Sequence, residues 1–250
     1  MKGTVFITGA TAGFGKATAE RFISEGWRVI GTGRRSDRLA ELKENYGESF
    51  HPAIFDVSDK KAIDEAIASL PADFAQVDVL VNNAGLALGT EPAHNTLLDE
   101  WETMIDTNVK GLVYMTRALL PGMVERGRGH VVNLGSVAGN YPYPGGNVYC
   151  ATKAFVKQFN LCLRADLAGT PIRMTNVEPG LCETEFSVVR FRGDKEKADQ
   201  VYEGTEPIVA EDIAEIVHWV CALPPHVNIN RIEVMPTCQG FAPFNIVRDK

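Results

Sequence analysis

Short apolar runs alternate along the chain with longer segments whose apolar residues recur at helical spacing. Several of the runs are apolar at successive positions, as expected for strands that are covered on both faces of a sheet. The pattern predicts seven strands, at Thr4–Thr8, Arg28–Thr32, Phe50–Phe55, Val77–Val81, His130–Leu134, Arg173–Val177 and Arg231–Met235. It predicts helices between them, at Gly15–Ser24, Arg38–Tyr46, Lys60–Leu70, Leu98–Val124, Tyr149–Leu167 and Glu211–Leu223.

This alternation predicts an α/β fold, a doubly wound parallel sheet of about seven strands with helices on both faces. A chain of 250 residues fits one domain of this class, so we expect residues 1–250 to form a single unit. Two stretches interrupt the alternation, 139–147, which is rich in Gly, Pro and Tyr, and 182–207, which is polar and mixed. Because long irregular loops often contact substrates, we expect 182–207 to be a substrate loop placed as a lid.

Composition and charge exclude several classes of protein. Hydrophobic residues make up 45% of the chain and charged residues 23%, which suits a globular core. The formal net charge of −7 argues against a nucleic-acid partner, because phosphate contacts need clustered Lys and Arg. No run of roughly 18 apolar residues could span a membrane, and the apolar start of the chain is too short and too rich in glycine for a signal peptide. We therefore expect a cytoplasmic protein.

The five cysteines favour free thiols. Their number is odd, their spacing is wide and no CxxC occurs. Neither a disulfide framework nor a zinc site is indicated, and we expect no metal.

The first predicted strand ends in a glycine-rich turn, Thr8-Gly9-Ala10-Thr11-Ala12-Gly13-Phe14-Gly15, where a helix is predicted to begin. Glycines let a pyrophosphate approach the backbone, and the helix N-terminus offers unpaired N–H groups and a positive dipole end. The spacing is GxxxGxG rather than GxGxxG, and such a turn alone could be a plain strand–helix connection. Its place after the first strand of an alternating chain favours dinucleotide binding.

The second predicted strand ends without an acidic residue, and Arg34 and Arg35 follow it. An Asp or Glu at this point would bind the adenosine 2′-hydroxyl of NAD, whereas an arginine accepts the 2′-phosphate of NADP. The guanidinium fork suits a phosphate dianion, so the pair predicts NADP. A solvated surface pair is the alternative, and Asp37 is a mild signal against NADP.

Tyr149 and Lys153 are four residues apart in a predicted helix, a spacing that places both on one face. A free phenol has a pKa of about 10, and a nearby ammonium lowers it. Ser136 follows a predicted strand, where ligands bind in open α/β sheets, and its hydroxyl can donate to a carbonyl oxygen. YxxxK alone is common by chance as a pair on a helix surface.

When YxxxK is taken together with the other motifs, however, the whole chain resembles a short-chain dehydrogenase/reductase. The residues that match the family pattern in order are Gly9, Gly13 and Gly15 in the turn, Asp56, Asn82–Gly85, Asn108, Ser136, Tyr149, Lys153 and Pro179-Gly180. The resemblance implies a Rossmann-like fold and hydride transfer between a nicotinamide cofactor and a hydroxyl or carbonyl carbon.

The resemblance also implies roles for single residues. Tyr149 would be the acid in reduction and the base in oxidation, Lys153 would hold the nicotinamide ribose and lower the pKa of Tyr149, and Ser136 would hold the substrate oxygen. Asn108 would keep a water that links Lys153 to solvent. The implied cofactor-binding residues are Gly9, Thr11, Gly13, Phe14, Gly15, Arg34, Arg35, Asp56, Val57, Asn82, Ala84, Gly85, Tyr149, Lys153, Pro179, Gly180 and Thr184.

Within the family, the chain is most similar to the NADP-dependent 3-hydroxy acid dehydrogenases, which act on serine, allo-threonine and 3-hydroxypropionate or reduce malonic semialdehyde. The stretches that carry this likeness are Asn82–Leu88, Glu91–His94, Trp101–Asn108, Pro142–Tyr149, Phe186–Gly193 and His226–Asn230. The sulfoacetaldehyde reductases, which form isethionate, have similar motifs and stay an alternative.

Both groups imply a small substrate, an aldehyde or a hydroxy acid, with an anion near the reacting carbon. A cation must accompany this anion, because burying an unpaired carboxylate or sulfonate is costly. Arg190 is the first candidate and Arg192 the second, each with a plain surface arginine as its alternative; Tyr143 and Asn147 could bond the anion or the hydroxyl. A carbonyl reductase for hydrophobic ketones is disfavoured by Arg190, and a non-catalytic NADP-sensing module by the intact Ser136, Tyr149 and Lys153.

The C-terminal tail, 237–250, is apolar for a chain end, and an exposed apolar segment often marks an interface. Tetramers are common in the enzymes that the chain resembles. We expect a homotetramer in which Phe244 or its neighbours approach the pocket of another subunit.

Overall fold

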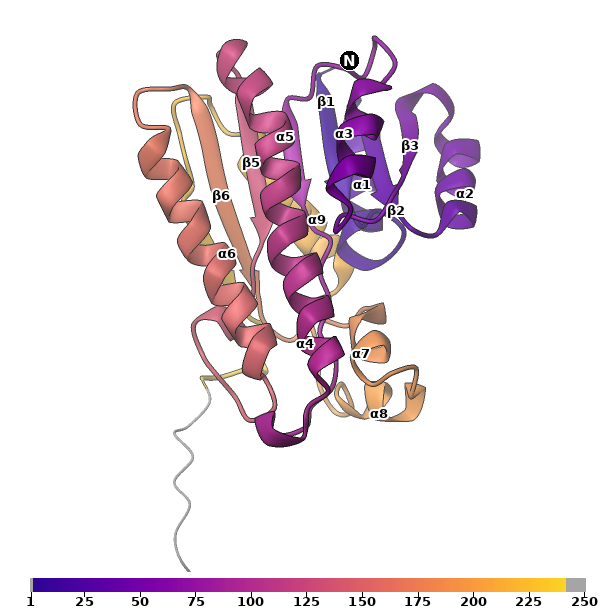
Figure 1. Cartoon of the computed structure of the whole chain (residues 1–250), viewed down its shortest axis with the longest axis vertical. Coiled ribbons are helices and arrows are strands. Elements are labelled where there is room, and N and C mark those ends of the chain that lie inside the picture. The colour runs from indigo at the N-terminus through magenta and orange to yellow at the C-terminus, as the bar shows by residue number, and fades with distance from the viewer. Residues whose placement is uncertain (1, 242–250) are drawn as a thin grey trace, which may run out of the picture.

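The computed structural model describes residues 2–241 and contains one parallel sheet (Figure 1). Its strands lie in the order β3-β2-β1-β4-β5-β6-β7, and each neighbouring pair is parallel. Their bounds are β1 Thr4–Thr8, β2 Arg28–Gly33, β3 Phe50–Ile54, β4 Val79–Asn82, β5 Gly129–Leu134, β6 Ile172–Pro179 and β7 Arg231–Val234. The predicted fold, a single-domain doubly wound sheet of seven parallel strands, is confirmed.

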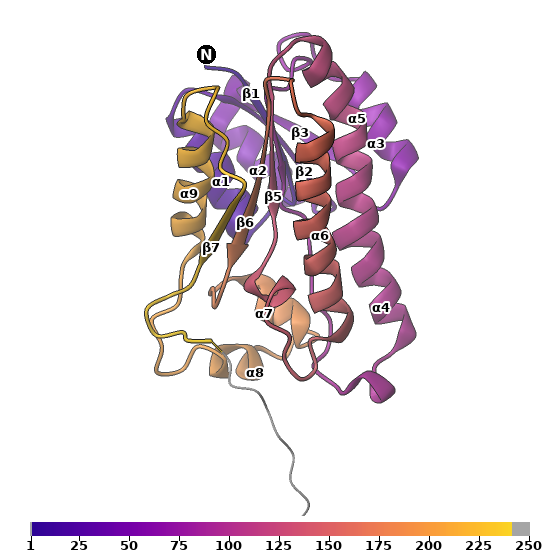
Figure 2. The ribbon, with the colours of Figure 1, turned by 90° about the vertical axis from the view of Figure 1, so that its left-hand side faces the viewer.

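Helices cover both faces of this sheet, as Figure 2 shows with the sheet nearly edge-on. On one face lie α1 (Gly13–Ser24), α2 (Ser36–Tyr46) and α9 (Ala210–Ala222); on the other lie α3 (Lys60–Ala68), α5 (Leu112–Glu125) and α6 (Asn147–Asp166). Phe22 and Val217 are fully buried in the first layer, and Met115 and Met123 in the second. Burying a side chain of this size stabilises the fold by about 1.5–3 kcal/mol, so both helix layers stabilise the packing against the sheet.

The predicted helix Leu98–Val124 is a continuous helical segment that consists of three parts. It comprises α4 (Leu98–Ile105), a π-helical turn η3 (Asp106–Gly111) and α5. Apolar spacing cannot distinguish a π turn from an α-helix, so the sequence pattern did not predict it. The turn contains the buried Asn108, and π turns inside helices often occur at functional sites.

The segment 182–207 was predicted to be irregular, and this prediction was wrong. It contains two short helices, α7 (Glu185–Arg190) and α8 (Lys195–Gln200). Side chains cap both: the Thr184 hydroxyl accepts from the Phe186 N–H, and the Asp194 carboxylate accepts from the Lys197 N–H. Helices of six residues are too short to show apolar periodicity, although their caps are visible in the sequence.

Short 3₁₀ turns complete the described chain, at η1 (Gly47–Ser49), η2 (Ala93–Asn95) and η4 (Val137–Gly139). The winding reverses between β1 and β4, since β2 and β3 extend the sheet to one side and β4 to β7 to the other. In open α/β sheets, ligands bind beyond the carboxyl ends of the strands at such a reversal. Among residues 2–241, no helix is both long and apolar enough to cross a membrane.

Candidate active site

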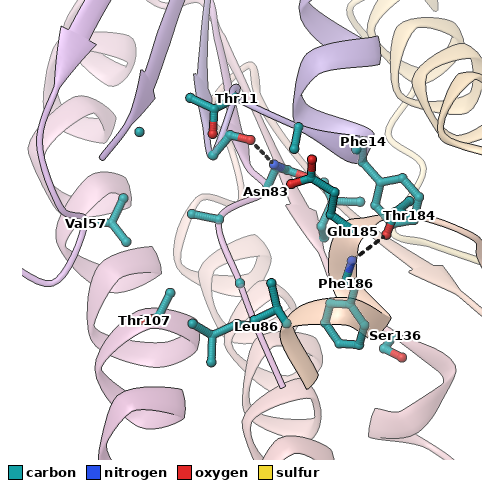
Figure 3. Close-up of a pocket in the computed structure, with 18 of the residues that line it drawn as sticks. Thr11, Phe14, Val57, Asn83, Leu86, Thr107, Ser136, Thr184, Glu185 and Phe186 are labelled. Atoms are coloured by element: carbon teal, nitrogen blue, oxygen red, sulfur yellow. Dashed lines mark hydrogen bonds between the residues drawn. The ribbon is translucent and has the colours of Figure 1, made fainter. Parts of the chain in front are cut away.

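A cleft of about 390 Å³ lies at the carboxyl ends of the strands, where the winding reverses (Figure 3). It brings together residues that the sequence analysis singled out and that lie far apart in the chain. These are Gly9, Thr11, Gly13, Phe14, Arg34, Arg35, Asp56, Val57, Ala84, Gly85, Ser136, Tyr149, Lys153, Pro179, Gly180 and Thr184. The cleft therefore extends from the end of β2 to the start of α6.

The glycine turn has the geometry that a phosphate cradle needs. Gly9 has φ +69°, a conformation that side chains disfavour, and a Cβ on Gly15 would collide with the Gly9 carbonyl. Gly15 thus lies behind the turn and not in the cleft. Asn83 stabilises the turn by donating to the carbonyls of Thr8 at 2.8 Å and Gly9 at 3.2 Å. No side chain caps α1, so its first N–H groups are available to an anion.

Three guanidinium groups gather where β2 ends. Arg34 is 71% exposed and lies 3.5 Å from the Asp56 carboxylate. Arg35 donates to the Thr11 hydroxyl at 2.8 Å and pairs with Glu185 at 2.9 Å, and Arg38 pairs with the same carboxylate at 2.8 Å. This basic group fits a phosphate ester beside the adenosine end of a dinucleotide.

Tyr149 and Lys153 lie one turn apart in α6, and both face the cleft with Ser136. The Lys153 ammonium is 5.8 Å from the centre of the Tyr149 ring and donates to the Leu134 carbonyl at 2.8 Å. The Ser136 hydroxyl accepts from the Ala138 N–H at 3.1 Å. A phenol, an ammonium and a hydroxyl thus converge at one end of the cleft, a set that can transfer a proton to a carbonyl oxygen.

The electrostatics of this end differ from the expectation that Lys153 lowers the pKa of Tyr149. Burial raises the pKa of Tyr149 well above its usual value, and a hydrogen bond with Ser136 opposes this only in part. Burial also lowers the pKa of Lys153 to about 8. The ammonium donates to the Leu134 carbonyl, and the phenol has little water around it, so desolvation dominates. The phenol is therefore protonated at neutral pH, the form needed in reduction.

Three asparagines that were predicted to belong to the site do not line the cleft. Asn82 is the last residue of β4; it is buried and donates to Thr116 and Asn133. Asn147 accepts from the Trp101 indole at 3.1 Å at the start of α6. Asn108 exchanges hydrogen bonds with the Leu86 backbone and donates to Thr152 at 3.1 Å. Asn108 lies close to Lys153, because a Cβ on Gly85 would lie 3.3 Å from the Asn108 Oδ1 and 3.4 Å from the Lys153 Nζ.

The two arginines that were predicted to bind the substrate anion, Arg190 and Arg192, have different surroundings. Arg190 donates to the Tyr143 hydroxyl at 2.9 Å and to the Gly89 carbonyl at 3.3 Å, and its guanidinium lies 5.2 Å from the Tyr143 ring centre. Within the described chain Arg190 pairs with no carboxylate. Arg192, in contrast, is paired with Glu91 at 2.8 Å and Glu100 at 2.7 Å. Only Arg190 retains an unneutralised charge, although neither arginine lines the main cleft.

Several residues of the site were missed by the sequence analysis. Phe186 and Val189 of α7 line the cleft, and the Phe186 ring centre is 5.6 Å from that of Tyr149. Leu86 and Thr107 line the opposite wall, as Figure 3 shows. Apolar wall residues have no motif, so no sequence signal separates them from core residues. Arg38 and Glu185 were detectable only as charges near predicted site residues.

The predicted contact of the C-terminal tail lies mainly outside the described residues, and Phe244 is among those not described. Within the described part, Phe241 is 68% exposed and its ring centre lies 5.0 Å from that of Tyr141.

Comparison with known proteins agrees with this geometry. A family model described as short chain dehydrogenase matches residues 3–195. An NADP-dependent 3-hydroxy acid dehydrogenase of Salmonella typhi is 60% identical over 245 residues, which cover 98% of this chain and 99% of that protein. A serine 3-dehydrogenase of Rhizobium radiobacter is 55% identical over 249 residues, which cover 100% of both chains.

Among solved structures, the closed form of a serine dehydrogenase complexed with NADP+ superimposes with a TM-score of 0.97 at 58% identity, covering 98% of this chain and 100% of that one. The match in sequence and fold extends over nearly the whole protein. The chain belongs to the short-chain dehydrogenase family.

Proposed function

We propose that the protein is an NADP(H)-dependent oxidoreductase that interconverts small anionic aldehydes and β-hydroxy acids, of the malonic semialdehyde/3-hydroxypropionate, serine or allo-threonine type. The observation that carries this proposal is the unneutralised guanidinium of Arg190, held by Tyr143 near the buried phenol of Tyr149. The names of relatives, a 3-hydroxy acid dehydrogenase and a serine 3-dehydrogenase, support the same class of substrate.

The residues of the cleft fit the coenzyme. The glycine turn and the uncapped start of α1 would hold the pyrophosphate, and Arg34 and Arg35 the 2′-phosphate. Asp56 and Val57 would contact the adenine, and Pro179, Gly180 and Thr184 the nicotinamide end. When bound, NADP(H) supplies or accepts the hydride, and the protein orients and polarises the reactants.

The side chains of the cleft would handle the proton. In reduction, the Tyr149 phenol gives its proton to the substrate oxygen, which Ser136 holds by a hydrogen bond. The Lys153 ammonium lies beside the phenol and stabilises the negative charge that develops on it. In oxidation the same phenol oxygen receives the proton back.

Arg190 would bind the anion that lies beyond the reacting carbon. Arg190 is the last residue of α7 and donates to Tyr143. The 182–207 segment, which contains α7, would therefore act as a substrate loop. A guanidinium donates hydrogen bonds equally well to a carboxylate or a sulfonate, so sulfoacetaldehyde reduction to isethionate stays the alternative within this class.

The test is an NADPH-oxidation assay with malonic semialdehyde, sulfoacetaldehyde and propanal. We expect the kcat/KM of at least one charged aldehyde to exceed that of propanal by tenfold or more, because a charge-assisted hydrogen bond contributes about 1.5–3 kcal/mol. The larger of the two charged values shows whether the site prefers a carboxylate or a sulfonate. Equal values for all three aldehydes would reject an anionic substrate, and no oxidation with any of them would reject the enzyme class.

A further inference from the structure

An ion-pair bridge crosses the coenzyme cleft from α7 to the start of α2. Glu185, in the first turn of α7, accepts from Arg35 at 2.9 Å on one carboxylate oxygen and from Arg38 at 2.8 Å on the other. Both arginines are anchored on the far side at Thr11, Arg35 on its hydroxyl at 2.8 Å and Arg38 on its carbonyl at 3.3 Å. We call this set of contacts the Glu185 bridge; it ties the substrate-loop helix to the glycine turn.

The Glu185 bridge lies over the place where a pyrophosphate would bind. Thr184 packs so closely on the turn that a Cβ on Gly13 would meet its side chain at 3.4 Å. Figure 3 shows Glu185 extending from α7 toward the Thr11 side of the cleft, whereas the Phe186 ring is directed toward Ser136. A dinucleotide that extends from Asp56 to Tyr149 must therefore pass beneath Thr184 and Glu185.

On the basis of the proposed use of NADP(H), we propose that Glu185 is a coenzyme-retaining residue. The Glu185 bridge closes over the bound dinucleotide and has to open before the dinucleotide can leave. This role differs from selection between NADP and NAD, because both coenzymes carry the pyrophosphate that lies beneath the bridge. It also differs from competition, in which the Glu185 carboxylate would occupy the arginines in place of the 2′-phosphate.

The chemistry of the bridge suits a gate that opens during turnover. The side chains of Glu185, Arg35 and Arg38 are 47%, 42% and 38% exposed, so water can replace each ion pair at little cost. The bridge joins the same helix that carries Phe186 and Arg190, so its opening also frees the wall of the substrate end. Release of the coenzyme and movement of the substrate loop are thereby coupled.

The test compares Glu185→Gln with Glu215→Gln as its matched control. Glu215, on α9, is an exposed carboxylate that pairs with Arg21 of α1 at 2.6 Å. Glu215 does not line the cleft. The dissociation rates of NADPH and of NADH from their binary complexes are measured by stopped-flow fluorescence. We expect Glu185→Gln to raise both rates by a similar factor, about three- to tenfold for two exposed ion pairs, and Glu215→Gln to leave both unchanged.

A second measurement uses the protein without coenzyme. Hydrogen exchange of the α7 amides should be faster in Glu185→Gln than in the wild type, because the bridge no longer holds the helix on the glycine turn. Unchanged release rates in Glu185→Gln, or slower release of NADPH alone, would overturn the proposal, and the latter would indicate competition with the 2′-phosphate. Failure of the wild type to bind NADPH would instead contradict the proposed function.

Discussion

At the scale of single residues, proton transfer depends on a phenol that is protonated because it is buried. Desolvation raises the pKa of Tyr149, and the same burial lowers that of Lys153 to about 8. At neutral pH the pair is therefore a neutral acid beside a cation, which suits donation of a proton to a carbonyl oxygen.

Tyr149→Phe should remove this proton donor and leave the coenzyme site intact. Loss of a positioned general acid typically costs 10²–10⁴-fold in rate, so we expect kcat to fall by about that factor. The measurement is NADPH oxidation in steady state together with the Kd for NADPH by fluorescence titration. Turnover near the wild-type rate would contradict the assignment, and a large rise in Kd would show that the change had damaged the cleft instead.

Arg34→Ala and Arg35→Ala test the basic group beside the end of β2. Each should weaken NADPH binding about 10- to 100-fold, because a hydrogen bond to a charged group contributes about 1.5–3 kcal/mol. The Kd for NADH should change little in Arg34→Ala, since NADH has no 2′-phosphate. Arg35→Ala also removes one ion pair of the Glu185 bridge, so its Kd for NADH should rise, but by a smaller factor than its Kd for NADPH. Arg117→Ala, at an exposed position on α5, is the control. An unchanged ratio of the two Kd values in both variants would reject this phosphate site.

Motifs predicted which residues gather in the cleft, but not where each side chain points. The glycine turn, Ser136, Tyr149 and Lys153 could be predicted because their spacing is tied to strand ends and to one helix face. Asn82 and Asn147 could not, since their orientation depends on partners that are 34 and 46 residues away in sequence. The Glu185 bridge joins residues about 150 positions apart, which no local pattern can indicate.

At the scale of elements, long periodic segments and buried strands were predictable, and short or irregular helices were not. Several of the seven strands followed from continuous apolar runs, as expected for parallel sheets with covered faces. The π turn within Leu98–Glu125 and the two helices of 182–207 depend on contacts of Asn108 and on capping, which leave no apolar period.

Strand β5 carries a buried histidine that predicts how stability depends on pH. His130 shares a hydrogen bond with Thr175 of β6 at 2.8 Å, and its Nδ1 has no partner among residues 2–241. Burial lowers the pKa of His130 to about 3, from about 6.5 in the unfolded chain. The unfolded state therefore binds the proton first, and stability from this group is complete above about pH 6.5 and is lost as the pH falls toward 3.

His130→Asn should remove this contribution. Between pH 6.5 and 4, the free energy of unfolding of the wild type should fall by about 1.4 kcal/mol per pH unit more than that of the variant. Urea unfolding at several pH values measures the two slopes, and His226→Asn, at an exposed position, is the control. Parallel slopes for the wild type and His130→Asn would contradict this assignment.

At the scale of the whole molecule, apolar side chains are exposed on both sides of the sheet. Phe155 and Leu161 of α6 are 38% and 44% exposed, and Trp219 of α9 is 49% exposed. These two helices cover opposite faces of the sheet (Figure 2). A tetramer with three perpendicular two-fold axes forms when each of two separate faces pairs with the same face of another copy. We therefore propose a homotetramer.

Light scattering after size exclusion should give about four times the chain mass of 27.3 kDa. Leu161→Glu and Trp219→Glu should each remove one interface and leave a species of half that mass, because a charge cannot be buried without a partner. A wild-type mass of one chain at micromolar concentration would contradict the assembly.

The central claim is that Arg190 selects an anionic substrate, and the most direct measurement is the ratio of kcat/KM for malonic semialdehyde to that for propanal. Arg190→Gln is compared with Arg192→Gln, whose cation is already neutralised by Glu91 and Glu100. We expect Arg190→Gln to lower the ratio about 10- to 100-fold and to leave propanal reduction unchanged, while Arg192→Gln should change the ratio little. An unchanged ratio in Arg190→Gln would contradict the claim.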